Sequence, residues 1–290
     1  MTNAYVSLDS FKDPGVANLS TTGNDARRLQ VLEDVSEQFN AYLGRFFYSL
    51  TSARYFAGNG KTELWLPHGW DLISITTLKE DTGSDASYGT TWAAADYFLM
   101  PYEANPAPGV NLGWNRENRP YRKLEINGLS TGSKKQWTQG QRRFELVGKW
   151  GYSECTEDTG VLINDATPFS SSATTLAVDG GTAPSAGDTL LIESEQLYVT
   201  AVSGNNLTVE RGVNGTTAAT HADDTAISRF VYPKQLVEAV VMQASRLWTR
   251  RVTGFTEEGG FEETGQISPI KGLGLDVRQM LDAFRIPTLA

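Results

Sequence analysis

The stretch DARRLQVLEDVSEQFNAYL, residues 25–43, places apolar side chains at steps of three and four. Those side chains are Leu29, Leu32, Val35, Phe39, Tyr42 and Leu43. This spacing puts one apolar stripe along an α-helix, because 3.6 residues complete a turn. Asn24 before the stretch suits an N-cap, and Gly44 after it suits a helix end. We therefore predict a helix over 25–43 with its stripe facing a core.

Two further helices are predicted near the end of the chain. Pro233 suits the first turn of a helix. The residues after it form a broad apolar face: Leu236, Val237, Val240, Val241, Ala244, Leu247 and Trp248. A shorter helix is predicted over about 273–284, and Pro287 ends it. Together with the helix over 25–43, these segments predict a helical core.

Residues 54–150 change to the two-residue alternation of β-strands. Segments 54–57 and 62–67 flank the turn Gly58-Asn59-Gly60 and predict a β-hairpin. Further segments with strand character are 71–79, 96–101, 124–126 and 143–150, and 102–121 is predicted as a long loop. These short strands predict a small antiparallel sheet beside the helices.

Residues 161–230 differ in composition from the rest of the chain. They contain no Trp and no Lys, and they carry eight acidic residues against two Arg. Short β runs alternate with turns, and Gly204-Asn205-Asn206 suits a hairpin turn. We predict an inserted all-β domain, barrel-like or sandwich-like, whose ends lie close together as inserted domains usually allow.

The predicted fold class is therefore α+β, with a helical core, a small antiparallel β-sheet and an inserted all-β domain. A length of 290 residues allows one large or two small domains. The predicted boundaries are 1–24 for an N-terminal arm, 25–160 with 231–290 for the core domain, and 161–230 for the insertion.

Composition narrows the classes of function. The chain has 34 acidic and 25 basic residues, which gives a net charge of −9. Such a chain is poorly suited to clamping nucleic acid. Its charge suits both a chain that stays soluble and one that lets DNA pass without sticking, and the sequence does not separate these two. No apolar run approaches the roughly 18 residues of a membrane span, and the first ten residues lack the pattern of a signal peptide. We expect no membrane partner.

No motif for catalysis or metal binding is found. The Walker A, Gly-x-Gly-x-x-Gly, Gly-x-Ser-x-Gly and Cys-x-x-Cys patterns do not occur. Cys155 is the single cysteine, and without a His partner it is interpreted as a tolerated thiol. His68 and His221 suit loops and turns. The acidic residues considered for calcium lack the spacing of a calcium loop: Asp179, Asp223 and Asp224. We expect no enzyme, no metal and no cofactor.

Most of the Trp residues are candidates for a platform that stacks on sugars or bases: Trp65, Trp70, Trp92, Trp114, Trp137 and Trp150. Their scatter through predicted strands and loops favours packing in the core and at interfaces instead. The platform remains the basis of one alternative function below.

A series of motifs runs along the chain: 42–47 (YLGRFF), 54–60 (RYFAGNG), 64–67 (LWLP), 73–78 (ISITTL), Trp92, 96–101 (DYFLMP), 147–152 (VGKWGY) and 243–251 (QASRLWTRR). In this order they resemble the head-to-tail connector, or adaptor, proteins of tailed bacteriophages. The resemblance covers about 25–152 and 233–285, and the chain departs from the compact pattern of that family at 161–230. Residues 190–221 separately resemble a small β module of other phage structural proteins.

The resemblance implies a structural virion protein in the neck of the particle, assembled in the host cytoplasm. It implies a homo-oligomeric ring, commonly of twelve copies, that binds the portal protein on one face and a tail-side stopper or tail-terminator protein on the other. Double-stranded DNA would pass non-specifically through its centre. The portal-contacting candidates are Leu275, Val277, Met280, Leu281, Phe284 and Ile286. The alternative for these residues is ordinary packing against the protomer's own helices.

Two further segments have expected roles in such a ring. The Gly-rich loop 253–266 is expected to face the channel, where negative charge keeps DNA mobile; its acidic residues are Glu257, Glu258, Glu262 and Glu263. Residues 161–230 are expected to project outward and to touch the capsid or a tail protein.

Two rival classes remain open. A receptor- or carbohydrate-binding tail or baseplate protein would use the β domain and exposed Trp. A hydrolase with scattered carboxylates is disfavoured, because no nucleophile or acid–base motif appears.

Overall fold

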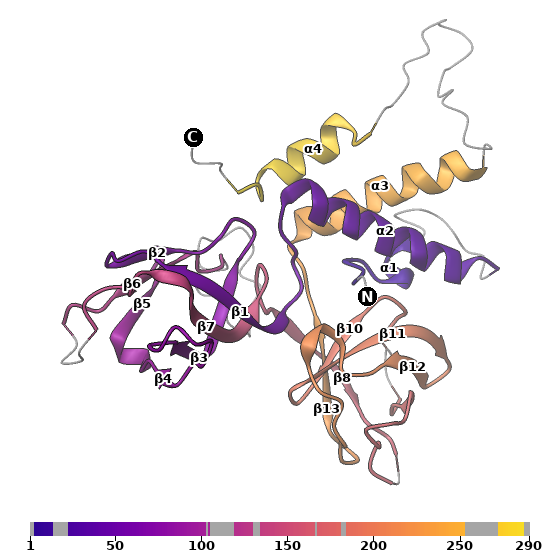
Figure 1. Ribbon diagram of the computed structural model, residues 1–290. Coiled ribbons are helices and arrows are strands. Elements are labelled where there is room, and N and C mark those ends of the chain that lie inside the picture. Colours follow the sequence, from indigo (N-terminus) through magenta and orange to yellow (C-terminus); the bar gives the residue numbers. More distant parts are fainter. Residues whose placement is uncertain are drawn as a thin grey trace, which may run out of the picture. The chain divides into compact units, whose positions relative to one another are not determined.

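The computed structural model divides the chain into two compact units, each with its own interior. Unit 1 comprises Met1–Leu43, Glu157–Val213 and Thr217–Ala290, and unit 2 comprises Gly44–Thr156 and Asn214–Thr216. The structure describes residues 3–13, 23–102, 104, 119–129, 134–165, 167–180, 184–252 and 272–286. The elements of both units are labelled in Figure 1.

The predicted fold class, a helical core with a small sheet, is wrong. Among the described residues 35% lie in strands and 24% in helices, and the strands form three antiparallel sheets. Helical periodicity is local and regular, so it is conspicuous in a sequence. The strands are short, and bulges break their alternation, for example between Phe56 and Gly58 and between Val199 and Ala201. The sequence pattern therefore underestimates the sheets.

The larger sheet of unit 2 is built around one long strand. Strand β7 (Gly140–Trp150) pairs on one side with β1 (Leu50–Gly58) and on the other with β3 (Leu72–Glu80). The short β4 (Thr90–Thr91) extends the sheet, in the order β1-β7-β3-β4. Trp150 is opposite both Leu50 and Leu72, so the strand ends meet there.

The second sheet of unit 2 shows that the predicted hairpin over 54–67 is wrong. It contains β2 (Glu63–Trp65), β6 (Lys123–Ile126) and β5 (Tyr97–Met100), in the order β2-β6-β5, with a 3-10 turn (Ala94–Asp96) before β5. Strands β1 and β2 therefore belong to different sheets. The Asn59 side chain accepts from Lys61 N at 2.9 Å and donates to Glu63 O at 2.8 Å, which turns the chain into the second sheet.

Aromatic side chains fill the core of unit 2. The Trp92 and Trp137 rings stack with centroids 4.6 Å apart, and Phe144 packs edge-on against both. The indole N–H groups are bonded: Trp92 to Glu80 Oε2, Trp137 to Thr62 O and Trp150 to Ser52 O. Core packing is therefore the role of these three Trp residues, as their scatter favoured.

A six-stranded antiparallel sheet occupies the segment 156–230. Its strands are β8 (Thr156–Leu162), β9 (Thr175–Ala177), β10 (Thr189–Ile192), β11 (Glu195–Ser203), β12 (Asn206–Glu210) and β13 (Ala226–Phe230), in the order β8-β13-β10-β11-β12-β9. Ser203 pairs with Asn206, so the hairpin predicted around Gly204 is confirmed. A fully buried apolar cluster, including Leu190, Leu197 and Leu207, packs inside it.

Four helices complete unit 1: α1 (Leu8–Lys12), α2 (Asp25–Leu43), α3 (Lys234–Val252) and α4 (Leu275–Asp282). Helix α2 has the predicted bounds, and its stripe is buried, with Leu32, Val35 and Phe39 fully covered. Helices α2 and α3 pack side by side (Figure 1). Among the helices of the described residues, none combines the length and the hydropathy that a membrane crossing requires.

The helices and the six-stranded sheet of unit 1 are bonded to each other. Tyr198 on β11 donates to Glu33 on α2 at 2.7 Å, and Leu8 N on α1 donates to Ala186 O at 2.8 Å. Phe11 on α1 is fully buried. The boundaries of the two compact units thus differ from those of the domains expected from composition. That 161–230 folds on a core of its own stays a prediction.

Candidate assembly surfaces

Helix α4 and the residues that follow it carry the side chains predicted to contact a portal, and most of them are buried. Val277 and Leu281 are fully buried, and Phe284 and Ile286 are also buried. Helix α4 packs against α3 and α2. The predicted alternative, packing against the protomer's own helices, therefore describes these four side chains in the protomer.

The outward side of α4 keeps a smaller set of groups. Leu275 is 78% exposed, and Met280 is partly exposed. Charged residues surround this apolar position: Asp276 pairs with Arg246 on α3, and Asp282 accepts from Tyr42 Oη at 3.3 Å. The Arg246 pair and hydrogen bonds to the backbone lower the pKa of Asp276. Helix α4 is thus joined to its neighbours by an ion pair and a hydrogen bond, and Leu275 is exposed to solvent.

The acidic residues predicted to face a channel, Glu257, Glu258, Glu262 and Glu263, lie outside the described residues. Their predicted role stays a prediction.

The second sheet of unit 2 exposes aromatic side chains on one face. Trp65 is 59% exposed, and Lys123 lies 5.5 Å from the centroid of its ring. Lys123 also pairs with Glu63 at 3.2 Å and Glu125 at 3.4 Å. Tyr102, which is 65% exposed, follows β5 and packs edge-on against Phe98. Exposed aromatic groups within a rim of paired charges are typical of protein-binding surfaces.

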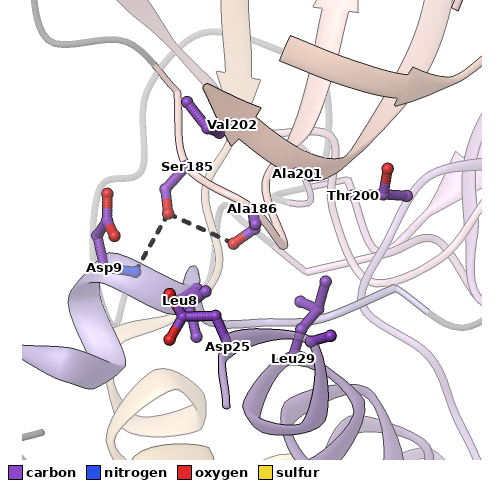
Figure 2. A pocket seen from close by; sticks show the side chains of 10 residues that line it. Leu8, Asp9, Asp25, Leu29, Ser185, Ala186, Thr200, Ala201 and Val202 are labelled. Atoms are coloured by element: carbon purple, nitrogen blue, oxygen red, sulfur yellow. Dashed lines mark hydrogen bonds between the residues drawn. The ribbon is translucent and has the colours of Figure 1, made fainter. Parts of the chain in front are cut away.

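A small cleft lies between α1, α2 and strand β11 within unit 1 (Figure 2). Its volume is about 220 Å³, below the roughly 300–1,000 Å³ of ligand pockets. Its lining residues are Leu8, Asp9, Asp25, Ala26, Leu29, Ser185, Ala186, Thr200, Ala201 and Val202. Asp25 is held by Lys12 and Arg28, each at 2.9 Å.

The polar groups of this cleft form hydrogen bonds and ion pairs within the protein. Ser185 Oγ accepts from Asp9 N at 3.1 Å and donates to Ala186 O at 3.5 Å (Figure 2). No His, Lys or Cys is among the lining residues, so Ser185 has no base beside it there. The cleft joins a helix layer to a sheet and carries no nucleophile–base pair.

A buried ionic network in the six-stranded sheet was missed at the sequence level. Glu195 is fully buried and receives Arg211 Nε at 2.7 Å, Arg211 Nη2 at 2.8 Å and His221 Nε2 at 2.8 Å. His221 Nδ1 lies 2.8 Å from Glu193 Oε2. His221 is 1% exposed, so its interpretation as a simple turn residue is wrong.

Hydrogen bonds explain why a buried carboxylate is tolerated in this network. Burial raises the pKa of Glu195, but bonds from Arg211, Ala219 N, His221 and Gly212 N outweigh it and hold the pKa at about 2. The sequence signal was the pair Glu193 and Glu195 in a turn followed by a lone Arg and a lone His, and nothing in that spacing shows that they meet.

Cys155 is buried, and burial raises the pKa of its thiol. A protonated thiol is a poor nucleophile, which fits the interpretation as a tolerated cysteine. Within the described part of the chain, no group of three or more His, Cys, Asp or Glu is placed to hold a metal ion.

No protein-family model matches this chain, and no curated protein matches it. One solved structure similar to it is titled "Neck of empty GTA particle computed with C6 symmetry". The likeness covers 100% of this chain and 97% of that chain, at 12% sequence identity and a TM-score of 0.43. A TM-score of this size does not establish a shared fold.

Proposed function

We propose that this chain is a structural subunit of a ring that joins the capsid portal to the tail of a tailed phage or a phage-like particle. Its activity is association: it binds copies of itself, the portal, and a tail-side stopper or terminator protein. Duplex DNA crosses the ring through its centre. The proposed location is the neck of the virion, after assembly in the host cytoplasm, with twelve copies as the expected number.

One observation carries this proposal. Seven of the eight motifs that resemble phage connectors are dispersed between residues 42 and 152, yet each places a side chain in, or packed against, one apolar cluster of unit 2. They include buried residues of one cluster, among them Phe56, Leu64 and Trp150. Seven motifs that were recognised by their order thus share one core, and the eighth, residues 243–251, lies on α3 in unit 1.

The exposed groups support the same proposal. A closed ring needs two different complementary patches on each protomer. Leu275 on α4 and the aromatic face around Trp65 are two such apolar positions, one in each unit. The six-stranded sheet is available for contact with the capsid or a tail protein.

Negative-stain electron microscopy of the full-length chain, with and without the portal, tests the proposal. We expect rings seated on the portal. Leu275→Asp should weaken this binding at least tenfold, because it puts a charge at an apolar contact. Leu129→Asp is the matched control, since Leu129 is 91% exposed in unit 2. A portal that stays bare at saturating protein would refute the proposal.

A receptor- or carbohydrate-binding tail protein is the second candidate. The exposed Trp65 ring with Lys123 beside it favours this alternative, because sugars stack on such rings. Glycan binding by the full chain that is lost in Trp65→Ala, without any binding to the portal, would favour the tail protein over the ring subunit.

A further inference from the structure

Unit 2 contains a cluster of arginines around a single carboxylate. Asp71, next to the start of β3, is 2% exposed. Arg45 Nε lies 2.9 Å from Asp71 Oδ2, and Arg122 Nε lies 3.8 Å from Asp71 Oδ1. The Arg45 side chain is buried, whereas the Arg122 side chain is 33% exposed. The carboxylate of Asp71 therefore lies in the buried part of the cluster, and the exposed part of the cluster is cationic.

Arg54 on β1 belongs to the same cluster, and aromatic rings hold it. Its guanidinium lies 4.3 Å from the Trp150 ring centroid and 5.0 Å from that of Trp70. Within the described part of the chain this guanidinium has no hydrogen bond and no ion pair. Asp71 raises the pKa of Arg54, against the larger effect of burial, so the two groups sense each other.

The cluster carries more positive charge than Asp71 neutralises. Burial lowers the pKa of Arg45; Asp71 opposes this, and the neighbouring Arg122 and Arg119 lower the pKa further. Arg119 is exposed. Arg45, Arg122 and Arg54 thus lie near one carboxylate, with Arg119 near Arg45. The repulsion among these guanidiniums is reduced when a further anion binds.

The excess of basic over acidic residues is found in unit 2 and not in the chain as a whole. Residues 44–156 carry thirteen Lys and Arg against eleven Asp and Glu, whereas the whole chain carries 25 against 34. An acidic chain that places several arginines near one carboxylate in its basic part has a concentrated site for an anion rather than a diffuse basic surface.

We propose that Arg45, Arg54 and Arg122 near Asp71, together with Arg119 near Arg45, bind phosphate groups of a nucleic-acid backbone. Guanidiniums bind phosphate oxygens through planar, paired N–H donors. Asp71 and Arg45 are buried, Arg122 is partly exposed, and Arg54 has donors that no described residue uses. A nucleic-acid backbone fits better than an acidic peptide, because its closely spaced phosphates meet several guanidiniums at once.

The inference deepens the proposed function and rests on it, because duplex DNA is the nucleic acid that the proposed ring admits. Binding should be independent of base sequence, because phosphate contacts position a duplex without specifying it. With two or three phosphates contacted, the logarithm of the binding constant should fall against the logarithm of salt concentration with a slope of about −2 to −3.

Fluorescence anisotropy of a labelled mixed-sequence duplex, titrated with the full-length chain at low salt, tests the inference. The double variant Arg54→Gln with Arg122→Gln should bind at least tenfold more weakly. Arg142→Gln is the matched control: Arg142 lies 4.6 Å from the Tyr55 ring, and Tyr55 points to the opposite face of β1 from Arg54. The control should bind within twofold of wild type.

A second variant keeps the test decisive if the double variant fails to fold. Arg119→Gln changes an exposed side chain and should weaken duplex binding about threefold, with the circular dichroism spectrum unchanged. Equal duplex affinity of wild type and both variants overturns the inference. Binding of inorganic pyrophosphate without binding of the duplex also overturns it.

The two proposals fail in distinguishable ways. If the wild type binds no duplex and the double variant loses ring formation in the microscope, the cluster is a protein interface and the inference is overturned. Loss of duplex binding in the variants with rings intact supports the inference. Duplex binding by a chain that never forms rings on the portal refutes the proposed function instead.

Discussion

Two arginines, Arg211 in unit 1 and Arg54 in unit 2, differ in how many hydrogen-bonding partners their guanidiniums have. The five N–H donors of Arg211 have five acceptors: both oxygens of Glu195 and the carbonyls of Ser170, Ala173 and Ala219. Its guanidinium also lies 4.2 Å from the Phe169 ring. Arg54 lies near the rings of Phe46, Trp70 and Trp150, without a hydrogen bond or ion pair from the described residues.

The difference separates a cation that stabilises the fold from one available for binding. A buried charge with every donor satisfied is costly to remove, because its partner is then left alone in a low-dielectric interior. An arginine with unused donors near the surface loses little when it is neutralised, and it can gain an anion from outside. Stability measurements on variants distinguish these two kinds of arginine.

The largest effect is expected for Arg211→Ala. Glu195 would keep its full burial but lose both of its paired donors, which predicts a loss of about 3–5 kcal/mol of unfolding free energy. Urea unfolding of the full-length chain measures it. Arg229→Ala is the control, because Arg229 pairs with Glu157 at the surface and should cost about 0–1 kcal/mol. Equal losses in the two variants would contradict the role of the network.

Acidification is expected to weaken unit 1 through the same carboxylate. The pKa of Glu195 is about 2 in the folded protein against an ordinary value of 4.5. Because the pKa of Glu195 is lower in the folded than in the unfolded protein, its contribution to the free energy of unfolding is present above about pH 4.5 and is lost as the pH falls towards 2. Unfolding free energies measured between pH 6 and 2.5 should fall for wild type. Arg211→Ala should lose less over this range, and an equally steep fall in that variant would refute the assignment.

A smaller effect is expected for Tyr198→Phe. The hydroxyl bonds Glu33 across the contact between β11 and α2, so its loss should cost about 1–2 kcal/mol. Tyr42→Phe is the matched control, since the Tyr42 hydroxyl reaches Asp282 at 3.3 Å in an exposed pair. Hydrogen exchange of α2 amides should accelerate in Tyr198→Phe alone. Unchanged exchange would show that the helices and the sheet of unit 1 are independent.

The smallest effect is expected for Arg54→Gln. No hydrogen-bonding partner among the described residues is left alone by this change, so only contacts with the rings are lost, which predicts a change within about 1 kcal/mol. Thermal unfolding followed by Trp fluorescence measures it. A loss as large as that of Arg211→Ala would mean that Arg54 stabilises the core and would remove the contrast on which the comparison rests.

Local patterns in the sequence predicted local structure well. The apolar stripe of 25–43 predicted helix α2, and Gly204 predicted the turn between β11 and β12, because both structures depend on residues close in the chain. The pairing of β1 with β7 joins Leu50 to Trp150, a hundred residues apart, and no spacing rule contains it. The fold class was therefore predicted with too much helix and too little sheet.

The candidate surfaces show the same limit. An apolar helical face packs equally well on its own protomer or on a partner, so the pattern of α4 did not distinguish buried Val277 and Leu281 from exposed Leu275. The arginines near Asp71 come from three segments of unit 2, around residues 45, 54 and 119–122, and converge only in the folded unit. Their functional meaning depends on which charges remain unpaired, and that is a property of the folded chain.

Cryo-electron microscopy of the assembled particle tests the central claim most directly. The account predicts several copies of this chain in a closed ring between the portal and the tail, with each copy touching a sister copy. Density for the chain at the distal end of the tail, or as isolated copies that contact neither the portal nor each other, would contradict it.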